Sequence, residues 1–280
     1  MTKVLMGRYK NIEKLQEQYL EATRGIIDHD RFNLYTITYH STKLEGSQLT
    51  YGQTERLLSD GIIESETKLV DNNMANDHHA ALKYVLSLGE NKIKLSLKEL
   101  QEISKRVMHT TGGIQSGDEG TYDIRLGEFR KDGRRWGTRV FPRSEKIVPM
   151  LTETIEILNK HIDQTKGFID VHYMAFDLLY DVINIHPFGD GNSRLSRLLK
   201  NYIQAYHGEP ITPVFSSAKK GFVNSINKSY FSENQKFYYD YMFDQLKLFY
   251  AREIIRSQGK EIREDQQINI SLLNDFGIKL

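Results

Sequence analysis

The placement of proline constrains the fold of this chain more than any other feature of its sequence. The first 140 residues contain no proline, and all five prolines lie between residues 142 and 213. Proline removes a backbone donor and clashes with the preceding helical turn, so few hard stops interrupt helices in the first half. Apolar residues at helical spacing predict helices there over residues 8–28, 31–44 and 71–89. Thr50 is expected to cap a further helix.

Glycine, threonine and arginine interrupt the helical pattern between residues 110 and 142. Seven glycines fall in this stretch, and Asp132-Gly133 has the composition of a two-residue hairpin turn. We therefore expect one short β-hairpin, with Val140 and Phe141 ending its second strand. The predicted fold class is mainly α. The further helices expected cover residues 97–108, 147–163, 168–185, 192–207, 218–228 and 233–256.

The composition excludes several classes of site and partner. The chain has no cysteine, which excludes disulfides and thiolate metal sites. Its 38 basic and 37 acidic residues leave a net charge of +1, without the basic excess that nucleic-acid binding usually requires. No apolar segment has the length of a membrane span, and the charged N-terminal residues do not resemble a signal peptide. We therefore expect a cytoplasmic protein that binds neither nucleic acid nor membrane.

Short, flexible residues precede the helix predicted from residue 192. Gly189, Gly191 and Asn192 expose backbone N–H groups just before a helix start, where the helix dipole also favours negative charge. Arg194 and Arg197 are three residues apart, so both project from the first turn of this helix. Two guanidinium groups beside a set of backbone amides suit a polyphosphate. The segment therefore predicts a phosphate-binding site.

Two further side chains of the same segment suit phosphoryl or nucleotidyl transfer. Asp190 lies in the loop, and a single carboxylate beside phosphates is the usual anchor for Mg²⁺. His186 ends the preceding helix, because Pro187 prevents that helix from continuing. An imidazole titrates near neutral pH, as a general base must. Each feature alone has an ordinary structural interpretation, but their concentration within twelve residues favours catalysis.

The segment HPFGDGNSRLSR, residues 186–197, closely resembles the signature of Fic-domain proteins, H-x-F-x-D/E-G-N-G-R-x-x-R. Every defined position matches except Ser193, which stands where glycine is usual. The segment LGEFR at residues 126–130 is similar to the G-x-Y/F-R that leads into the flap of this family. The resemblance covers about residues 97–250. It implies a helical Fic-type domain with a short β-hairpin flap and an N-terminal helical layer.

The resemblance also implies a reaction, the transfer of AMP from Mg-ATP to a protein hydroxyl. His186 would take the proton from a target Tyr, Thr or Ser, whose oxygen attacks the α-phosphate and releases pyrophosphate. Asp190 would hold Mg²⁺, Arg194 would bind near the β-phosphate, and Arg197 would bind the γ-phosphate. Phe188 would anchor the loop in the core. The nucleotide-binding residues implied are Gly189, Asp190, Gly191, Asn192, Ser193, Arg194, Arg197, Tyr238 and Tyr239.

The resemblance implies that the hairpin over residues 129–141 is the flap, which pairs with an extended segment of the target protein by strand addition. The basic residues of this hairpin suit an exposed strand edge, because their positive charge discourages unwanted strand pairing. Tyr238 and Tyr239 resemble paired aromatic positions that line the nucleotide pocket of the family. The expected docking residues of the flap are Phe129, Arg130, Trp136, Thr138 and Val140.

A second motif implies that the site is inhibited by its own chain. The segment STKLEG, residues 41–46, matches the family pattern S/T-x-x-x-E-G/N. Ser41 and Glu45 lie on one helix face, and Gly46 suits the helix end. Glu45 would pair with Arg197, occupy the arginine meant for the γ-phosphate, and misalign the α-phosphate for attack. On its own, the motif is equally compatible with an ordinary helix end.

Two other functions are compatible with these residues. In the reverse chemistry, Glu45 would position a water that removes AMP from a modified protein, and His186 would protonate the leaving hydroxyl. In a third interpretation, favoured only by Ser193, the chain is a non-catalytic nucleotide-sensing or interaction module. The partner expected for the leading interpretation is a target protein, and the chain itself is one such target.

The expected organisation has three parts. The N-terminal helical region carries the inhibitory motif, and the Fic domain follows. The C-terminal tail has an apolar pattern that suits self-association into a homo-oligomer. These regions are predicted at residues 1–95, 96–250 and 251–280.

Overall fold

The computed structural model describes residues 3–26, 28–260 and 278, and these residues are mainly helical, which confirms the predicted fold class. Contacts divide the chain into two compact units. The larger unit comprises residues 34–211, and the smaller unit combines the described parts of residues 1–33 and 212–280. The predicted three-part organisation stays a prediction.

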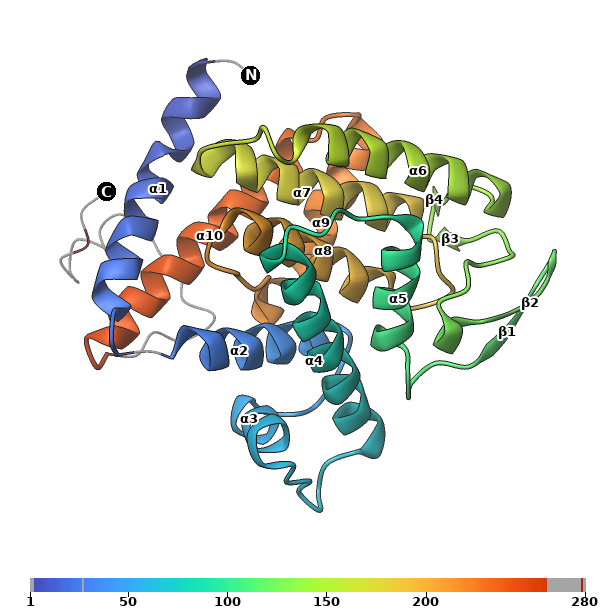
Figure 1. Cartoon of the computed structure of the whole chain (residues 1–280), viewed down its shortest axis with the longest axis horizontal. Helices are drawn as coiled ribbons and strands as arrows, with labels where there is room; N and C mark the ends of the chain where they lie inside the picture. Colours follow the sequence, from blue (N-terminus) through green and yellow to red (C-terminus); the bar gives the residue numbers. More distant parts are fainter. Residues whose placement is uncertain (1–2, 27, 261–277, 279–280) are drawn as a thin grey trace. The chain divides into compact units, whose positions relative to one another are not determined.

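Helices account for most of the regular structure in the described residues (Figure 1). Two single turns of 3-10 helix, Ile124–Leu126 and Ser216–Ala218, accompany them. The α-helices are α1 Lys3–Thr23, α2 His29–Leu44, α3 Tyr51–Asp60, α4 Leu69–Glu90, α5 Leu97–Val107, α6 Ser144–His161, α7 Phe168–Ile185, α8 Asn192–His207, α9 Lys219–Ser232 and α10 Lys236–Ser257.

Helix α8 is buried along nearly its whole length and packs against both α7 and α4 in the larger unit (Figure 1). Leu195, Leu198 and Leu199 of its predicted apolar stripe are fully buried. Gly89 allows α4 to approach closely, because a Cβ at that position would come within 2.8 Å of the Tyr202 carbonyl oxygen. This packing fixes the N-terminal end of α8, where the signature segment lies.

The described residues form two β-hairpins where the sequence predicted one (Figure 1). Strand β1, Ile114–Gly117, pairs antiparallel with β2, Gly120–Asp123. Strand β3, Arg135–Trp136, pairs antiparallel with β4, Arg139–Val140, and this second hairpin corresponds to the predicted flap.

The turn of the flap hairpin lies five residues after the predicted one. The prediction of Asp132-Gly133 is wrong, because the chain reverses at Gly137-Thr138, where Gly137 has a left-handed φ of +58°. Asp132 instead accepts hydrogen bonds from the Tyr122 hydroxyl at 3.2 Å and from Arg134 Nε at 3.1 Å. Its carboxylate therefore ties the flap to β2 rather than forming the turn.

Several predicted helix boundaries also differ from the structure by a few residues, among them the end of α1 and the start of α6. The first helix was expected over residues 8–28, but α1 ends at Thr23, and Gly25 then adopts a left-handed φ of +72°. Helix α6 begins at Ser144 rather than at residue 147, so Pro149 lies inside it. Pro149 is exposed, so the carbonyl that lacks its amide partner can be solvated.

The smaller unit packs α1 and α9 against α10 through aromatic side chains. The rings of Tyr9 and Phe243 stack at 4.0 Å, and the Tyr9 hydroxyl donates to Asp240. Tyr19 is fully buried beside Tyr250, with ring centroids 5.2 Å apart. None of the helices in the described part of the chain combines the length and apolarity needed to cross a membrane.

Candidate active site

The loop between α7 and α8 is closed by the side chain of Asn192. Its Nδ2 donates to the Phe188 carbonyl at 2.8 Å, and its Oδ1 accepts from the Phe188 amide at 2.9 Å. Phe188 is fully buried and packs beside Phe129, with ring centroids 5.2 Å apart, as expected of an anchor. The Asn192 side chain therefore braces the loop that leads into α8.

Both glycines of the loop occupy positions with no room for a side chain. A Cβ on Gly191 would lie 2.8 Å from Met108 Sδ, and Gly191 also has a left-handed φ of +78°. A Cβ on Gly189 would lie 2.3 Å from Gln115 Oε1. Met108 and Gln115 therefore support the loop from outside the signature, and no sequence pattern indicated either of them.

The two arginines of α8 are both buried at 3% exposure. Arg194 donates to the Val107 carbonyl at 3.3 Å and contacts Met108 Sδ at 3.0 Å. One oxygen of Asp190 lies 3.8 Å from the Arg194 guanidinium. Arg194 therefore joins α8 to the end of α5, and its charge lies beside the loop where the sequence predicted a phosphate site.

Arg197 is held by three residues from two distant parts of the sequence. Its Nη2 donates to Glu45 Oε1 at 2.7 Å and to the Ser41 carbonyl at 2.9 Å. Its Nε donates to Ser41 Oγ at 2.9 Å, and its Nη1 donates to Ser193 Oγ. The structure thus brings together Ser41, Glu45 and Arg197, as predicted for the inhibitory motif. Gly46 follows at the end of α2 with φ +108°.

The Glu45 carboxylate is ionised in this arrangement. Partial burial, with 28% of the side chain exposed, raises its pKa, but the charge and hydrogen bonds of Arg197 outweigh burial and lower the pKa below its usual value. A hydrogen bond from Ser193 lowers it further. Ser193, the one departure from the signature, therefore contacts both members of the ion pair.

The ring of His186 faces the end of the flap. Its centroid lies 4.2 Å from that of Phe141, with the two rings inclined by 23°. Its backbone adopts a left-handed φ of +54°, and its amide donates to the Val182 carbonyl at 2.9 Å. His186 thereby ends α7 and points away from the helical path, which Pro187 cannot continue.

The environment of His186 keeps its imidazole neutral. Burial lowers its pKa most, and the charges of Arg130, Arg139 and Arg134 lower it further, while the Ile183 carbonyl opposes them, giving a pKa of about 4. At neutral pH the ring therefore has a free lone pair and can accept a proton.

Asp190 presents an exposed carboxylate beside the start of α8. Its side chain is 64% exposed, and one oxygen accepts the Gly191 amide at 2.5 Å. The described residues contain no cluster of three or more His, Asp or Glu that could hold a metal ion by themselves. This donor set fits Mg²⁺ bound jointly by one carboxylate and phosphate oxygens.

The predicted flap residues differ in their accessibility. Trp136 and Val140 are 52% and 55% exposed, and Thr138 is also exposed. Phe129 is half-buried against the loop. Arg130 is only 1% exposed, so its side chain offers almost no surface to a target segment, and its part in docking stays a prediction. An arginine of a basic, flexible stretch gives no sequence signal of such burial.

The predicted aromatic pair lies in the smaller unit. Tyr238 is fully buried in α10, and the hydroxyl of the half-buried Tyr239 donates to Gln235 Oε1 at 2.7 Å. Their contribution to a nucleotide pocket stays a prediction.

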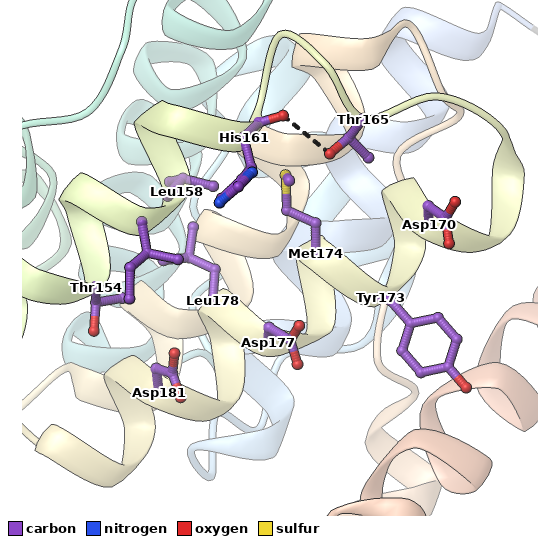
Figure 2. Close-up of a pocket in the computed structure, with 11 residues that line it drawn as sticks. Thr154, Leu158, His161, Thr165, Asp170, Tyr173, Met174, Asp177, Leu178 and Asp181 are labelled. Carbon is purple, nitrogen blue, oxygen red and sulfur yellow. Dashed lines mark hydrogen bonds between the residues drawn. The ribbon is translucent and has the colours of Figure 1, made fainter. Parts of the chain in front are cut away.

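A separate hollow of about 280 Å³ lies between α6 and α7 (Figure 2). Its lining includes Leu158, Met174 and Leu178 together with Asp170 and Asp181, and none of the signature residues. Burial and the neighbouring Asp177 raise the pKa of Asp181 to about 6. The hollow is therefore distinct from the loop that carries His186.

Residues 94–204 match the model of the Fic/DOC family, and this range contains the signature loop, both hairpins and most of α8. Residues 94–204 of the chain form a Fic domain. The protein adenylyltransferase fic-1 of Caenorhabditis briggsae is 28% identical over 216 residues, which cover 75% of this chain and 40% of that protein. The protein adenylyltransferase Fic of Drosophila grimshawi is 28% identical over 172 residues, covering 61% of this chain and 33% of that protein.

Solved structures show the same fold around this Fic domain. A Fic domain-containing signaling protein from Bacteroides thetaiotaomicron superposes with a TM-score of 0.73 at 22% identity, covering 90% of this chain and all of that one. Residues 134–508 of Fic-1 from Caenorhabditis elegans superpose with a TM-score of 0.70 at 21% identity, covering 90% of this chain and 71% of that one. The matched region spans less than half the length of the two adenylyltransferases named above.

Proposed function

We propose that this chain transfers AMP from Mg-ATP to a hydroxyl side chain of a target protein. The observation that carries the proposal is the signature loop, which places a neutral His186 and the two buried arginines of α8 around one helix N-terminus. The adenylyltransferase names of the related proteins support the same reaction. The acceptor hydroxyl would belong to a target protein, and the chain itself is one candidate.

Each residue of the loop has a distinct part in the proposed reaction. The neutral imidazole of His186 would accept the proton of the attacking hydroxyl, whose oxygen bonds to the α-phosphorus as the bond to pyrophosphate breaks. The backbone amides at the start of α8 would hold phosphate oxygens, aided by the helix dipole. Arg194 and Arg197 would neutralise the phosphates that leave as pyrophosphate.

Asp190 would hold Mg²⁺ together with the phosphates. When bound, the ion neutralises phosphate charge and polarises the phosphoryl oxygens. The exposed carboxylate of Asp190 leaves room for such shared binding, and its bond to the Gly191 amide fixes it beside the helix N-terminus.

Glu45 would keep the enzyme inhibited. Its carboxylate already occupies the guanidinium of Arg197 that the γ-phosphate would need, and two like charges cannot share this position favourably. ATP would then bind weakly or with its α-phosphate misaligned for in-line attack. Release of this contact would be required for transfer.

The proposed function is tested with the Glu45→Gly variant and Mg-ATP. Mass spectrometry of treated lysate proteins should find the mass of one AMP on Tyr, Thr or Ser side chains, far more often than with wild type. A His186→Ala change in the same variant should abolish the modification while calorimetry still detects ATP binding. Undiminished transfer without His186 would remove it from the role of base.

A second candidate is removal of AMP from a modified protein. The ionised, partly exposed Glu45 beside the loop favours it, because a carboxylate there could position a water for attack on the phosphorus. Incubating an AMP-modified protein with wild type and with Glu45→Gly separates the two. Removal of AMP by wild type but not by the variant would support this second function.

A further inference from the structure

Arg130 connects the flap to the catalytic loop from a buried position. Its guanidinium donates to the carbonyl groups of Asp132 and Pro142, which lie before and after the flap hairpin. On the other side, its Nε donates to the His186 carbonyl at 2.7 Å, and its Nη2 reaches the Ile185 carbonyl at 3.5 Å. One side chain thus satisfies backbone acceptors from two segments that lie far apart in the sequence.

The backbone of Arg130 adds a further bond to the same loop. Its amide donates to the Pro187 carbonyl at 3.0 Å. The carbonyls of residues 185–187 follow the end of α7, where the intrahelical amide partners run out. Arg130 therefore supplies donors where Pro187 has removed the helical continuation.

These bonds surround a strained residue. His186 is a non-glycine residue with φ +54°, a conformation that persists only when the surrounding structure holds it. Arg130 thus binds the carbonyl groups of the two successive peptide bonds that follow this strained position, those of His186 and Pro187. The direction of the His186 ring, stacked on Phe141, depends on that backbone conformation.

We propose that Arg130 is a positioning residue that holds the general base of the proposed transfer reaction in its productive orientation, and that it does not dock the target. This inference rests on the proposed function for its kinetic consequence only. Its structural part, the control of the His186 backbone and ring, holds whatever reaction the loop catalyses.

Arg130 also acts on His186 through its charge. Burial is the main cause that lowers the His186 pKa, and the charge of Arg130 comes next. The charges of Arg139 and Arg134 also lower the pKa, and the Ile183 carbonyl raises it. Removing the charge of Arg130 should therefore raise the pKa toward, but not up to, its ordinary value. A lysine at this position keeps the charge but cannot bridge carbonyl groups on both sides.

The two substitutions separate geometry from charge. In the full chain carrying Glu45→Gly, Arg130→Lys should lower kcat for AMP transfer about a hundredfold, since a displacement of the order of 1 Å at a reacting group has that effect, while KM for ATP changes little. Arg130→Met should lower kcat at least as much. The matched control is Lys131→Met, which removes the neighbouring cation, whose ammonium binds the Thr121 carbonyl and not the catalytic loop.

Histidine-labelled NMR provides a readout that needs no activity, with the His186 signal assigned from the His186→Ala spectrum. At pH 5 the wild-type and Arg130→Lys rings should be neutral, and the Arg130→Met ring should be partly protonated. Arg130→Lys should nevertheless shift the His186 resonances, whereas Lys131→Met should leave them in place.

Unchanged His186 resonances in both Arg130 variants, or full kcat in Arg130→Lys, would overturn the inference. If Arg130→Met does not fold, Arg130→Lys alone decides through its resonances and kcat. If Glu45→Gly transfers no AMP at all, the proposed function fails, and the NMR comparison still decides the role of Arg130.

Discussion

The contact between Glu45 and Arg197 should weaken the binding of ATP and stabilise the folded protein when no nucleotide is bound. Replacing Glu45 by Gln keeps the size of the side chain and removes its charge. A hydrogen bond between charged groups contributes about 1.5–3 kcal/mol, and this one is short at 2.7 Å with Arg197 almost fully buried. Since binding of the γ-phosphate must break the contact, the Kd for ATP should fall by roughly one to two powers of ten in Glu45→Gln.

Loss of the Glu45 charge should destabilise the nucleotide-free protein. The guanidinium of Arg197 would stay buried with only neutral acceptors, those of Ser41, Ser193 and the new amide. The free energy of unfolding should drop by about 1–3 kcal/mol, and Tm should fall by about 2–4 °C for each kcal/mol. Saturating ATP should restore more stability to the variant than to wild type.

Isothermal titration calorimetry with Mg-ATP measures the affinity, with His186→Ala in every protein to prevent turnover. Glu64→Gln is the matched control, because Glu64 forms a close ion pair with Arg56, whose side chain is half exposed. It should change neither Kd nor Tm appreciably. Equal ATP affinity of Glu45→Gln and the parent protein, within twofold, would refute the reasoning.

Three further outcomes are expected. Ser193→Gly removes a hydroxyl that contacts both Arg197 and Glu45, so the affinity for ATP should rise about 3- to 10-fold, which is less than in Glu45→Gln. Calorimetry measures this affinity, and an unchanged Kd would show that Ser193 has no part in the contact. In Glu45→Gly, kcat/KM should be nearly constant from pH 8 down to about 5.5, because His186 must be neutral to act as base and its pKa is about 4. A pH profile in which kcat/KM falls to half near pH 6.5 would contradict the lowered pKa. Trp136→Ala should raise KM for the protein target about 5- to 10-fold at unchanged ATP affinity, since Trp136 is exposed on the flap. Steady-state kinetics would exclude docking of the target on Trp136 if KM for the target is unaltered.

The sequence predicted the helical elements well where one apolar stripe decides the structure. The stripe through Leu195, Leu198 and Leu199 is buried as expected, because helical spacing and core burial agree along α8. The loop before it was predictable for a similar reason: glycine and proline limit the local backbone so strongly that few conformations remain.

The flap was predicted less well, because local turn preferences compete with side-chain contacts. Asp132-Gly133 has the stronger turn composition, but Asp132 binds Tyr122 and Arg134, and the chain reverses at Gly137 instead. Hydrogen bonds between separate segments do not leave a periodic pattern in the sequence. The burial of Arg130 was not predictable for the same reason, because its side chain donates to backbone carbonyl groups of separate segments.

The contacts of Ser193 show what a signature alone leaves out. The sequence identified it as the single departure from the family pattern and gave no partner for it. The structure places its hydroxyl against Arg197, four residues later on the same helix, and within reach of Glu45 from α2's end. A mismatch to a family pattern therefore becomes interpretable only when its spatial neighbours are known.

The central claim is that the loop from His186 to Arg197 transfers the α-phosphoryl group with its adenosine. The most direct measurement incubates the Glu45→Gly chain and a lysate with ATP labelled either at the α-phosphate or at the γ-phosphate, in parallel with Glu45→Gly/His186→Ala. We predict that protein takes up the α-label and no γ-label, and only when His186 is present. Uptake of γ-label, or no α-label on any protein despite measured ATP binding, would contradict the claim.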